Sequence, residues 1–582
     1  MKSWLCCFIV VLLSLSIEGG EPNWKQTLQS EYAWSKITET GTLLVSTKKR
    51  LLNINPVDGK VIWQRDDMAS LSPFNVSAIP GTPLLLINEH EGTIPPKTQL
   101  QVVNVETGES LWDTGIFTAA NLIAIPIPSH NLVLFGADHI GAPPWYKSDK
   151  DFKSGAHMSA LKLDTGEIVY DTPMANLKSA TRHRSDTSGG WIPDMDLSGH
   201  PSVVIEDNII YLPFTGLTAM KLDTGEIVWD TEFKTAHQSL KFTNAQPVIS
   251  GDIIYTSGVG RIYAVNKSTG EILWNTKVGR NYAIPELLIS DDNVIGRIGG
   301  SFSNGENLLQ AKPFGVVALK RDSGKKRWLW KKGKKGMTNI VHLPERNWIM
   351  VADRYNLYAL DTRAKKRPKI AKKVELEFKR ALGTAEMAAK GAEAASGFLS
   401  GGLLGGIQGG FKAFGSDDDR DDPPTNVSIV GGDLIVRGQY HLLSYDTDSK
   451  DIEFSIAFEP PGMNGLALAA MGAVTAVNTL GNTGLHSSWG RRNMALNNSL
   501  NVSSAFTSSV SQRYAKSEQV DNLAFFLTTK EEGLQLIGIN LVDGSEVGAI
   551  PMDEKEPQFM VDNISNTVYY MRDGKEVIAY PF

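Results

Sequence analysis

The chain has 582 residues, and its 64 acidic and 58 basic side chains give a formal net charge of −6. This charge argues against a nucleic-acid partner, because such partners are bound by a basic surface. Hydrophobic residues make up 42% of the chain and charged residues 21%, which is typical of a globular protein and argues against intrinsic disorder.

Residues 1–20 have the features of a secretory signal peptide. Lys2 supplies a positive charge, and Leu5 to Leu15 form an apolar run. The run is too short to cross a bilayer comfortably and no stop-transfer sequence follows; an uncleaved anchor is the alternative. Cys6 and Cys7 both lie in this run, so cleavage would leave a mature chain without disulfides or thiolate ligands. We expect an exported protein, periplasmic or extracellular.

One motif recurs along the rest of the sequence. In SALKLDTGEIVYDT at 159–172, apolar and polar residues alternate, an Asp-Thr-Gly turn follows, and the next run contains a large aromatic residue. Alternation with period two predicts strands, and the turn predicts a hairpin whose glycine takes a positive φ. Nine copies are found, at 51–64, 101–114, 159–172, 218–231, 263–276, 317–330, 357–370, 442–455 and 537–550.

Each copy is preceded by two more strand-like runs, such as 246–250 and 252–258. A unit of four short antiparallel strands is the blade of a β-propeller. A flat aromatic residue at a fixed place in each unit can dock against the next sheet and bury a large area. The predicted docking residues are Trp63, Trp112, Tyr170, Trp229 and Trp274.

The repeats of the form Ala-x-[Asp/Asn]-x-x-Thr-Gly-x-x-x-Trp resemble those of the quinoprotein alcohol dehydrogenase-like (PQQ-like repeat) β-propeller family. The resemblance covers residues 22–360 well and 424–582 loosely. It implies an all-β fold, a single β-propeller of four-stranded antiparallel blades, with eight blades expected. The nine copies and a terminal half-unit at 566–582 count to ten instead. Pairing of the segment 21–28 with that half-unit would close the ring and remove both sheet edges.

Two insertions are predicted to interrupt the blades. The first has a helix-favouring start and a glycine-rich apolar stretch at 396–415, and the second has an apolar run at 465–477 before an Asn/Ser-rich stretch. Both runs could meet a membrane surface or a hydrophobic partner; the alternative is a loop or helical hairpin packed on the propeller. The predicted parts are a signal peptide (1–20), N-terminal blades (21–371), a helical and Gly-rich insertion (372–423), a blade (424–459), a second insertion (460–518) and the last blades (519–582).

Two long polar loops, at 137–152 and 183–200, hold the candidate ligand-binding residues. Binding residues concentrate in loops on a rigid scaffold, and carboxylates, histidines and aromatics can form a cation or sugar site. Solvated loops are the alternative. The candidates are Asp138, His139, Trp145, His183, Asp186, Trp191, Asp194, Asp196 and His200. The basic cluster KKGKKG at 331–336 is interpreted as a solvated turn, with contact to anionic lipid or polysaccharide as the alternative.

The family resemblance does not decide the function, because it covers both dehydrogenases and assembly scaffolds. We expect an exported, non-catalytic propeller that acts as a protein-interaction or assembly scaffold in the cell envelope, with another envelope protein as its partner. One alternative is a dehydrogenase that depends on pyrroloquinoline quinone (PQQ) and calcium. A mature chain without cysteine could not form the vicinal disulfide that many such enzymes carry. Another alternative is a surface protein that binds carbohydrate or another polymer. No catalytic residue, cofactor site or metal ligand is assigned.

Overall fold

The structure is a computed structural model, and its regular structure is almost entirely β. It describes residues 21–69, 71–73, 75–91, 95–148, 152–174, 182–184, 191–193, 195–196, 203–213, 216–233, 245–303, 308–378, 424, 426–438, 441–458, 522–530, 533–554, 557–562 and 564–582. Short 3-10 turns are η1 (Asp66–Met68), η2 (Pro128–His130) and η5 (Pro344–Arg346). The signal segment, the Gly-rich stretch 396–415 and the insertion 460–518 lie outside the described residues.

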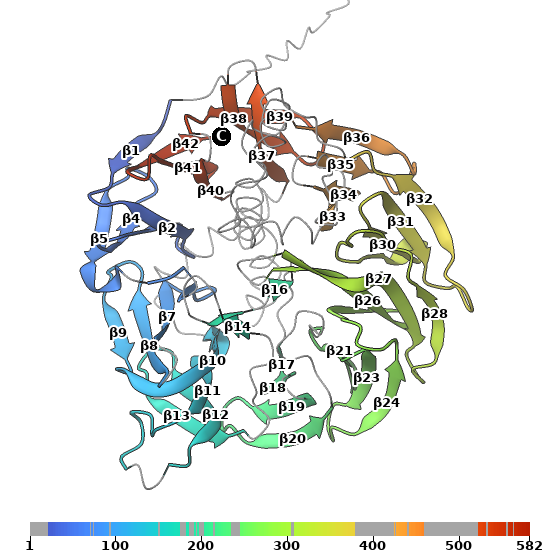
Figure 1. The fold of residues 1–582 in the computed structure, drawn as a ribbon, viewed down its shortest axis with the longest axis horizontal. Coiled ribbons are helices and arrows are strands. Elements are labelled where there is room, and N and C mark those ends of the chain that lie inside the picture. The colour runs from blue at the N-terminus through green and yellow to red at the C-terminus, as the bar shows by residue number, and fades with distance from the viewer. Residues whose placement is uncertain are drawn as a thin grey trace, which may run out of the picture.

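The strands form a ring of antiparallel sheets (Figure 1) that contains ten blades, numbered here in chain order. Blades 2 and 3 are joined into one sheet by pairing of β8 with β10. Within a blade the strands follow one another from the inside of the ring to its outside. Blade 1 contains β2 (Tyr32–Ile37), β3 (Leu43–Thr47), β4 (Leu51–Ile54) and β5 (Val61–Arg65). Blade 2 contains β6 (Val76–Ala78), β7 (Leu84–Glu91), β8 (Lys97–Asn104) and β9 (Ser110–Asp113). Blade 3 contains β10 (Phe117–Ile127), β11 (Leu132–His139), β12 (Gly155–Lys162) and β13 (Ile168–Pro173).

The next four blades repeat this plan. Blade 4 contains β17 (Val204–Glu206), β18 (Ile209–Leu212), β19 (Gly216–Lys221) and β20 (Ile227–Glu232). Blade 5 contains β21 (Val248–Ser250), β22 (Ile253–Gly258), β23 (Arg261–Asn266) and β24 (Ile272–Lys277). Blade 6 contains β25 (Glu286–Ser290), β26 (Asn293–Ser303), β27 (Leu308–Lys320) and β28 (Lys326–Trp330). Blade 7 contains β29 (Val341–Leu343), β30 (Trp348–Ala352), β31 (Asn356–Asp361) and β32 (Ile370–Glu375).

The last three blades complete the ring. Blade 8 contains β33 (Asn426–Val430), β34 (Asp433–Arg437), β35 (His441–Tyr445) and β36 (Ile452–Ala457). Blade 9 has three strands among the described residues, β37 (Leu523–Lys530), β38 (Gly533–Asn540) and β39 (Glu546–Pro551). Blade 10 contains β40 (Gln558–Asp562), β41 (Thr567–Arg572), β42 (Glu576–Pro581) and, as its outermost strand, β1 (Trp24–Thr27).

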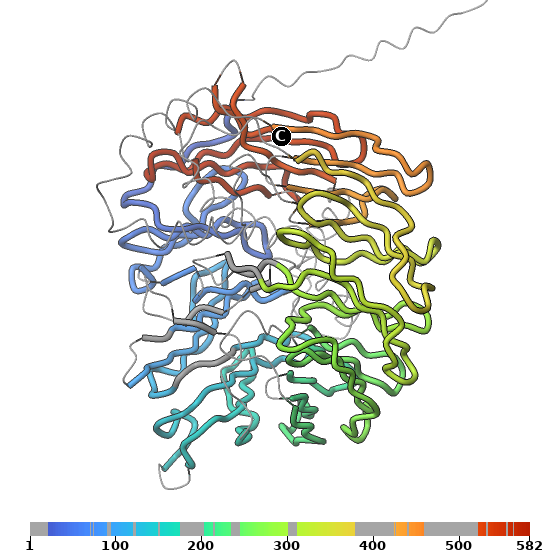
Figure 2. The backbone as a smooth tube through the Cα atoms, turned by 45° about the vertical axis from the view of Figure 1, so that its right-hand side comes forward, coloured from blue at the N-terminus to red at the C-terminus, as the bar shows by residue number. Residues whose placement is uncertain are grey.

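Pairing of the two ends of the chain closes the ring. β1 runs antiparallel to β42, with Trp24 opposite Ala579 and Thr27 opposite Glu576. Figure 2 shows the blue N-terminal and red C-terminal segments beside each other at this seam. The arrangement is the one expected for residues 21–28, and it leaves β42 paired on both sides.

Two expectations from the sequence need correction. The structure has ten blades rather than the eight expected for the family, because each of the nine motif copies forms the outer hairpin of its own blade and the terminal half-unit makes a tenth. The insertion expected from residue 372 also starts later, because Ile370–Glu375 form β32 and pair with β31. Leu376 and Phe378 then bury their side chains in the core beside blade 8. Pairing and burial thus override the helix-favouring composition of this stretch.

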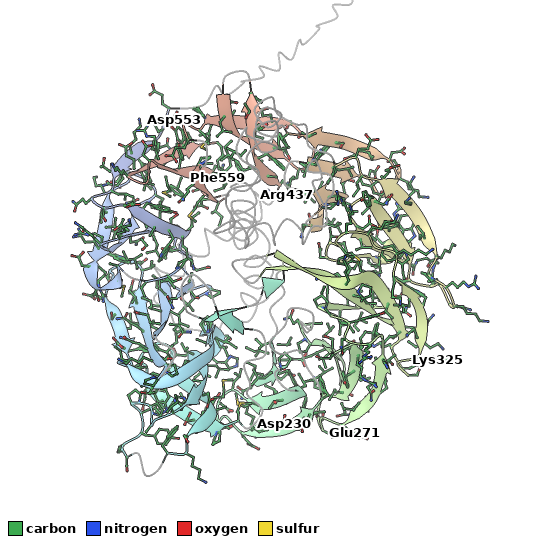
Figure 3. All side chains as sticks on the ribbon, in the orientation of Figure 1. Asp230, Glu271, Lys325, Arg437, Asp553 and Phe559 are labelled. Atoms are coloured by element: carbon green, nitrogen blue, oxygen red, sulfur yellow. The ribbon has the colours of Figure 1, made fainter. Side chains whose placement is uncertain are left out.

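The core lies between neighbouring blades, where facing sheets pack side chain against side chain (Figure 3). One cluster joins Met158 of blade 3 to Ile210 and Met220 of blade 4. Each blade is therefore stabilised mainly through its neighbours, as in other repeat proteins.

Outer-strand aromatics fasten most of the blades to the next one. Trp63 Nε1 donates a hydrogen bond to the carbonyl oxygen of Val105 (2.6 Å), and a Cβ added at Gly108 would lie 2.7 Å from the Trp63 ring. Trp112, Trp229 and Trp274 repeat this contact, and Tyr170 packs on Gly225 without an indole hydrogen bond. All five predicted docking aromatics therefore lie against the turn of the following blade.

Candidate functional site

The two faces of the ring differ in the connections that they carry. Because successive strands of a blade run in opposite directions, turns between its first and second and between its third and fourth strands lie on one face, here called the motif face. Connections between second and third strands and from one blade to the next lie on the opposite face, here called the connection face. All six turn glycines of the Trp–Gly and Tyr–Gly contacts, such as Gly108, therefore belong to the motif face.

Three long connections begin and end on the connection face: the β11–β12 loop after residue 139, the chain between blades 3 and 4, and the segment that leaves after Phe378. The second insertion leaves this face after Phe458 but rejoins at β37, the second strand of blade 9, which starts on the motif face. The insertions leave the described chain after Phe378 and Phe458 and rejoin it at the start of blade 8 and before β37. Both predicted polar loops, at 137–152 and 183–200, therefore belong to connections of this face.

His139 is buried in an aromatic cage rather than presented to a ligand. Its side chain is 1% exposed and stacks on Phe117, with ring centroids 5.8 Å apart, while Phe135, Trp145 and Phe152 meet it edge-on. Neither ring nitrogen has a hydrogen-bond partner among the described residues. Burial lowers the pKa of His139 to about 4, so the ring is neutral at pH 7.

The neighbouring polar groups of blade 3 are engaged with one another. His157 Nδ1 lies 2.9 Å from Asp171 Oδ2, and its Nε2 lies 2.9 Å from the carbonyl oxygen of Lys153. The Tyr146 hydroxyl donates to Asp171 Oδ2 (2.6 Å), and burial, followed by this hydrogen bond, raises the Tyr146 pKa to about 12. These contacts tie the β11–β12 loop to the blade. Asp138, by contrast, is exposed, because successive residues of β11 point to opposite sides.

The other candidates lie in the chain between blades 3 and 4. His183 and Trp191 belong to a small hairpin of β14 (Arg182–Arg184) and β15 (Trp191–Pro193). Asp196 belongs to β16 (Met195–Asp196), which pairs with β26 of blade 6 and lies toward the middle of the ring (Figure 1). Asp186, Asp194 and His200 lie outside the described residues.

A cavity lies on the connection face between blades 6 and 7. It has a volume of about 850 Å³ and falls within the usual size range of ligand pockets. It is lined by three separate segments, namely strand β27, the link between blades 6 and 7 and the β30–β31 turn, through Lys312, Pro313, Phe314, Lys331, Gly333, Lys334, Lys335 and Tyr355. We call it the lysine cleft. The sequence draws attention only to KKGKKG at 331–336, because Lys312 and Tyr355 come from other parts of the chain.

Among the described residues, no three His, Cys, Asp or Glu side chains gather closely enough to hold a metal ion. The buried carboxylate of Glu286 in blade 6 is instead paired with Arg297, whose Nε lies 2.8 Å away. No helix among the described segments has the length and apolar character needed to cross a membrane.

The closed ring of four-stranded antiparallel sheets, with Asp-Thr-Gly-type turns and docked aromatics, defines a β-propeller built from PQQ-like repeats. A family model agrees: the PQQ_2 model, described as outer membrane protein assembly factor BamB, matches residues 11–124 and 97–296. The chain belongs to the PQQ-like repeat β-propellers.

Solved structures with similarity to the chain are of several kinds. BamB from Moraxella catarrhalis is 12% identical, with 71% of this chain and 95% of that chain covered and a TM-score of 0.34. The dihydro-heme d1 dehydrogenase NirN in complex with DHE is 9% identical, with 75% and 80% covered and a TM-score of 0.34. Hsv2p from Kluyveromyces lactis is 9% identical, with 60% and 100% covered and a TM-score of 0.29. No curated protein matches the sequence. Likenesses at these levels do not transfer a function.

Proposed function

We propose that the protein is an exported, non-catalytic propeller that acts as an assembly scaffold in the cell envelope and binds its protein partner through the connection face. The observation that carries the proposal is that three of the long connections, including the β11–β12 loop and the chain between blades 3 and 4, begin and end on that face. The match to the BamB family model supports a scaffold role, since that model is described as an assembly factor.

The physical basis is a rigid ring that presents variable chain on one side only. On the motif face most turns between third and fourth strands are short and are fixed by contact with the aromatic of the preceding blade, as at Gly108 and Gly166. The connections on the other face carry no such contact, so they can lengthen without disturbing the ring. Binding residues are found mainly in loops that a rigid scaffold positions.

The contacts of the candidate residues in blade 3 support a structural role for the β11–β12 loop. His139 has no access to solvent, and the hydrogen bonds of His157, Tyr146 and Ser159 all converge on Asp171. The blade therefore holds the β11–β12 connection in one place, as a partner-binding surface requires.

Site-specific photocrosslinking in intact cells tests this proposal. The photoreactive residue replaces Lys147 or Arg280 on the connection face, or Val57 or Val542 on the motif face; all four are exposed. We expect one identified envelope protein to be captured from both connection-face positions and from neither motif-face position. Capture of the same protein from the motif face, or recovery of the chain only from the cytoplasmic fraction, would show the proposal to be wrong.

A further inference from the structure

The four lysines of the lysine cleft carry positive charge that no described side chain neutralises. Lys312, Lys331 and Lys334 are exposed and Lys335 is half-buried. Within the described part of the chain, none of the four ammonium groups has a carboxylate within ion-pair distance. Lys331 instead lies over the Tyr282 ring, with Nζ 5.6 Å from the centroid and 3.3 Å from the hydroxyl.

Asp353, the acidic residue beneath the cleft, is already engaged. It is 1% exposed, and its oxygens accept hydrogen bonds from the backbone N–H groups of Lys334 (3.0 Å), Tyr355 (2.8 Å) and Asn356 (2.9 Å). Its carboxylate therefore fixes the turn that carries Tyr355 and the loop that carries Lys334. The floor of the cleft is rigid, while the ammonium groups around it remain available.

The cleft also lies in the basic sector of an otherwise acidic ring. Residues 312–378, which form most of blades 6 and 7, hold 19 Lys and Arg against 6 Asp and Glu, a net charge of +13. The rest of the chain holds 39 against 58, a net charge of −19. Such a separation of charge steers anions toward one sector and raises their local concentration there.

We propose that the lysine cleft binds a phosphate-bearing ligand. Several ammonium groups around one cavity favour a ligand that carries more than one negative charge. A single carboxylate carries only one. Lysine binds phosphate as a point charge, and a phosphate monoester carries close to two charges near neutral pH. Phe314, Pro313 and Tyr355 offer an apolar wall for the group that bears the phosphate. This proposal does not depend on the scaffold function.

The phosphate can belong to a soluble compound or to a lipid headgroup, and two probes distinguish these sources. Inorganic pyrophosphate, titrated calorimetrically into the full-length mature chain, reports soluble phosphate. Co-sedimentation with phosphatidylcholine vesicles, with and without phosphatidic acid, reports a headgroup. Physiological ionic strength is needed in both, because screening over about 8 Å then suppresses long-range effects of the basic sector.

A matched pair of variants tests the site. The cleft variant replaces Lys312, Lys331, Lys334 and Lys335 by Gln. The control replaces Lys325, Lys326, Lys365 and Lys366 by Gln, which removes the same charge from the same blades on the motif face. All four control lysines are exposed, and Figure 3 shows Lys325 at the outer rim. Surface changes of this kind alter stability little, and circular dichroism with thermal melting checks that both variants fold.

We expect the cleft variant to bind its probe at least about tenfold more weakly than the wild type, while the control changes less than about threefold. Pyrophosphate binding without vesicle binding assigns a soluble ligand, and binding only to phosphatidic acid vesicles assigns a headgroup. Equal losses in both variants, or no binding of either probe by the folded wild type, would overturn the proposal.

Discussion

Substitution of Gly108 by alanine should destabilise the ring through the contact with Trp63. Gly108 has a φ of 74°, and a left-handed conformation costs an alanine about 1–2 kcal/mol. Its new Cβ would also lie 2.7 Å from two atoms of the Trp63 ring, closer than such contacts allow. Overpacking of this kind adds about 1–3 kcal/mol. We therefore expect a total loss of about 2–5 kcal/mol.

Gly251→Ala separates the two contributions. Gly251 has a φ of 60°, but nothing lies within 4 Å of its added Cβ, so this variant should show the backbone cost alone. The assay is urea unfolding of the mature chain, followed by far-UV circular dichroism. In a chain that carries Trp63→Ala the clash is absent. Gly108→Ala should then lower the free energy of unfolding only as much as Gly251→Ala does. Equal destabilisation by the two glycine variants in the wild-type background would refute the docking argument.

Three further perturbations have expected outcomes. Burial lowers the pKa of His139 to about 4, whereas the unfolded value is about 6.5. The stability that depends on the neutral ring is therefore fully present above about pH 6.5 and is lost as the pH falls from there through the folded pKa. Between pH 7 and pH 5 the wild type should lose about 2 kcal/mol of unfolding free energy through this group, and His139→Phe should not show this loss in urea titrations at the two pH values. Arg297→Met should destabilise by about 3–5 kcal/mol by removing the charge partner of buried Glu286, and Glu286→Gln in the same chain should recover part of this loss in the same titration. Removal of residues 21–28 takes β1 away from β42, so the shortened chain should melt at lower temperature and self-associate in analytical ultracentrifugation; an unchanged monomer would contradict the closure.

The blade plan could be predicted from the sequence because its signals are local. In the copy at 218–231, for example, alternation, turn and aromatic all lie within fourteen residues, and the structure forms β19, the turn at Gly225 and β20 there. Closure by 21–28 followed from a simple requirement, since a terminal unit with a missing strand and a lone strand-like segment both leave edges unpaired. The start of the first insertion was misplaced because Lys372 and Lys373 favour a helix but pair with β31.

The candidate site could be predicted only in part, because its residues come together through the fold. The lysine cleft combines the β26–β27 hairpin, the link between blades 6 and 7 and the β30–β31 turn, which lie far apart along the chain. Of the predicted pair Asp138 and His139, only Asp138 is accessible to a ligand, and its role stays a prediction. Composition marks both as potential ligands, but the strand that contains them points one outward and buries the other.

Blade 7 shows why the two faces of the ring differ. In blades 1 to 6 and in blade 9, the turn between third and fourth strands places a glycine under an aromatic of the preceding blade, and this contact leaves no room for a longer turn or a side chain. The turn of blade 8 has no glycine, and Lys450 takes the positive φ there. In blade 7 the turn from Asp361 to Lys369 is longer and contains no glycine, and Ala364 packs against the cluster that holds Trp328. The indole nitrogen of Trp328 correspondingly lacks a hydrogen-bond partner within the described residues. Where the docking contact is lost, the turn is free to lengthen. The connections described on the opposite face lie outside this repeated contact between a glycine and the aromatic of the preceding blade, so the proposed partner-binding segments can differ in length there without loss of the docking contacts.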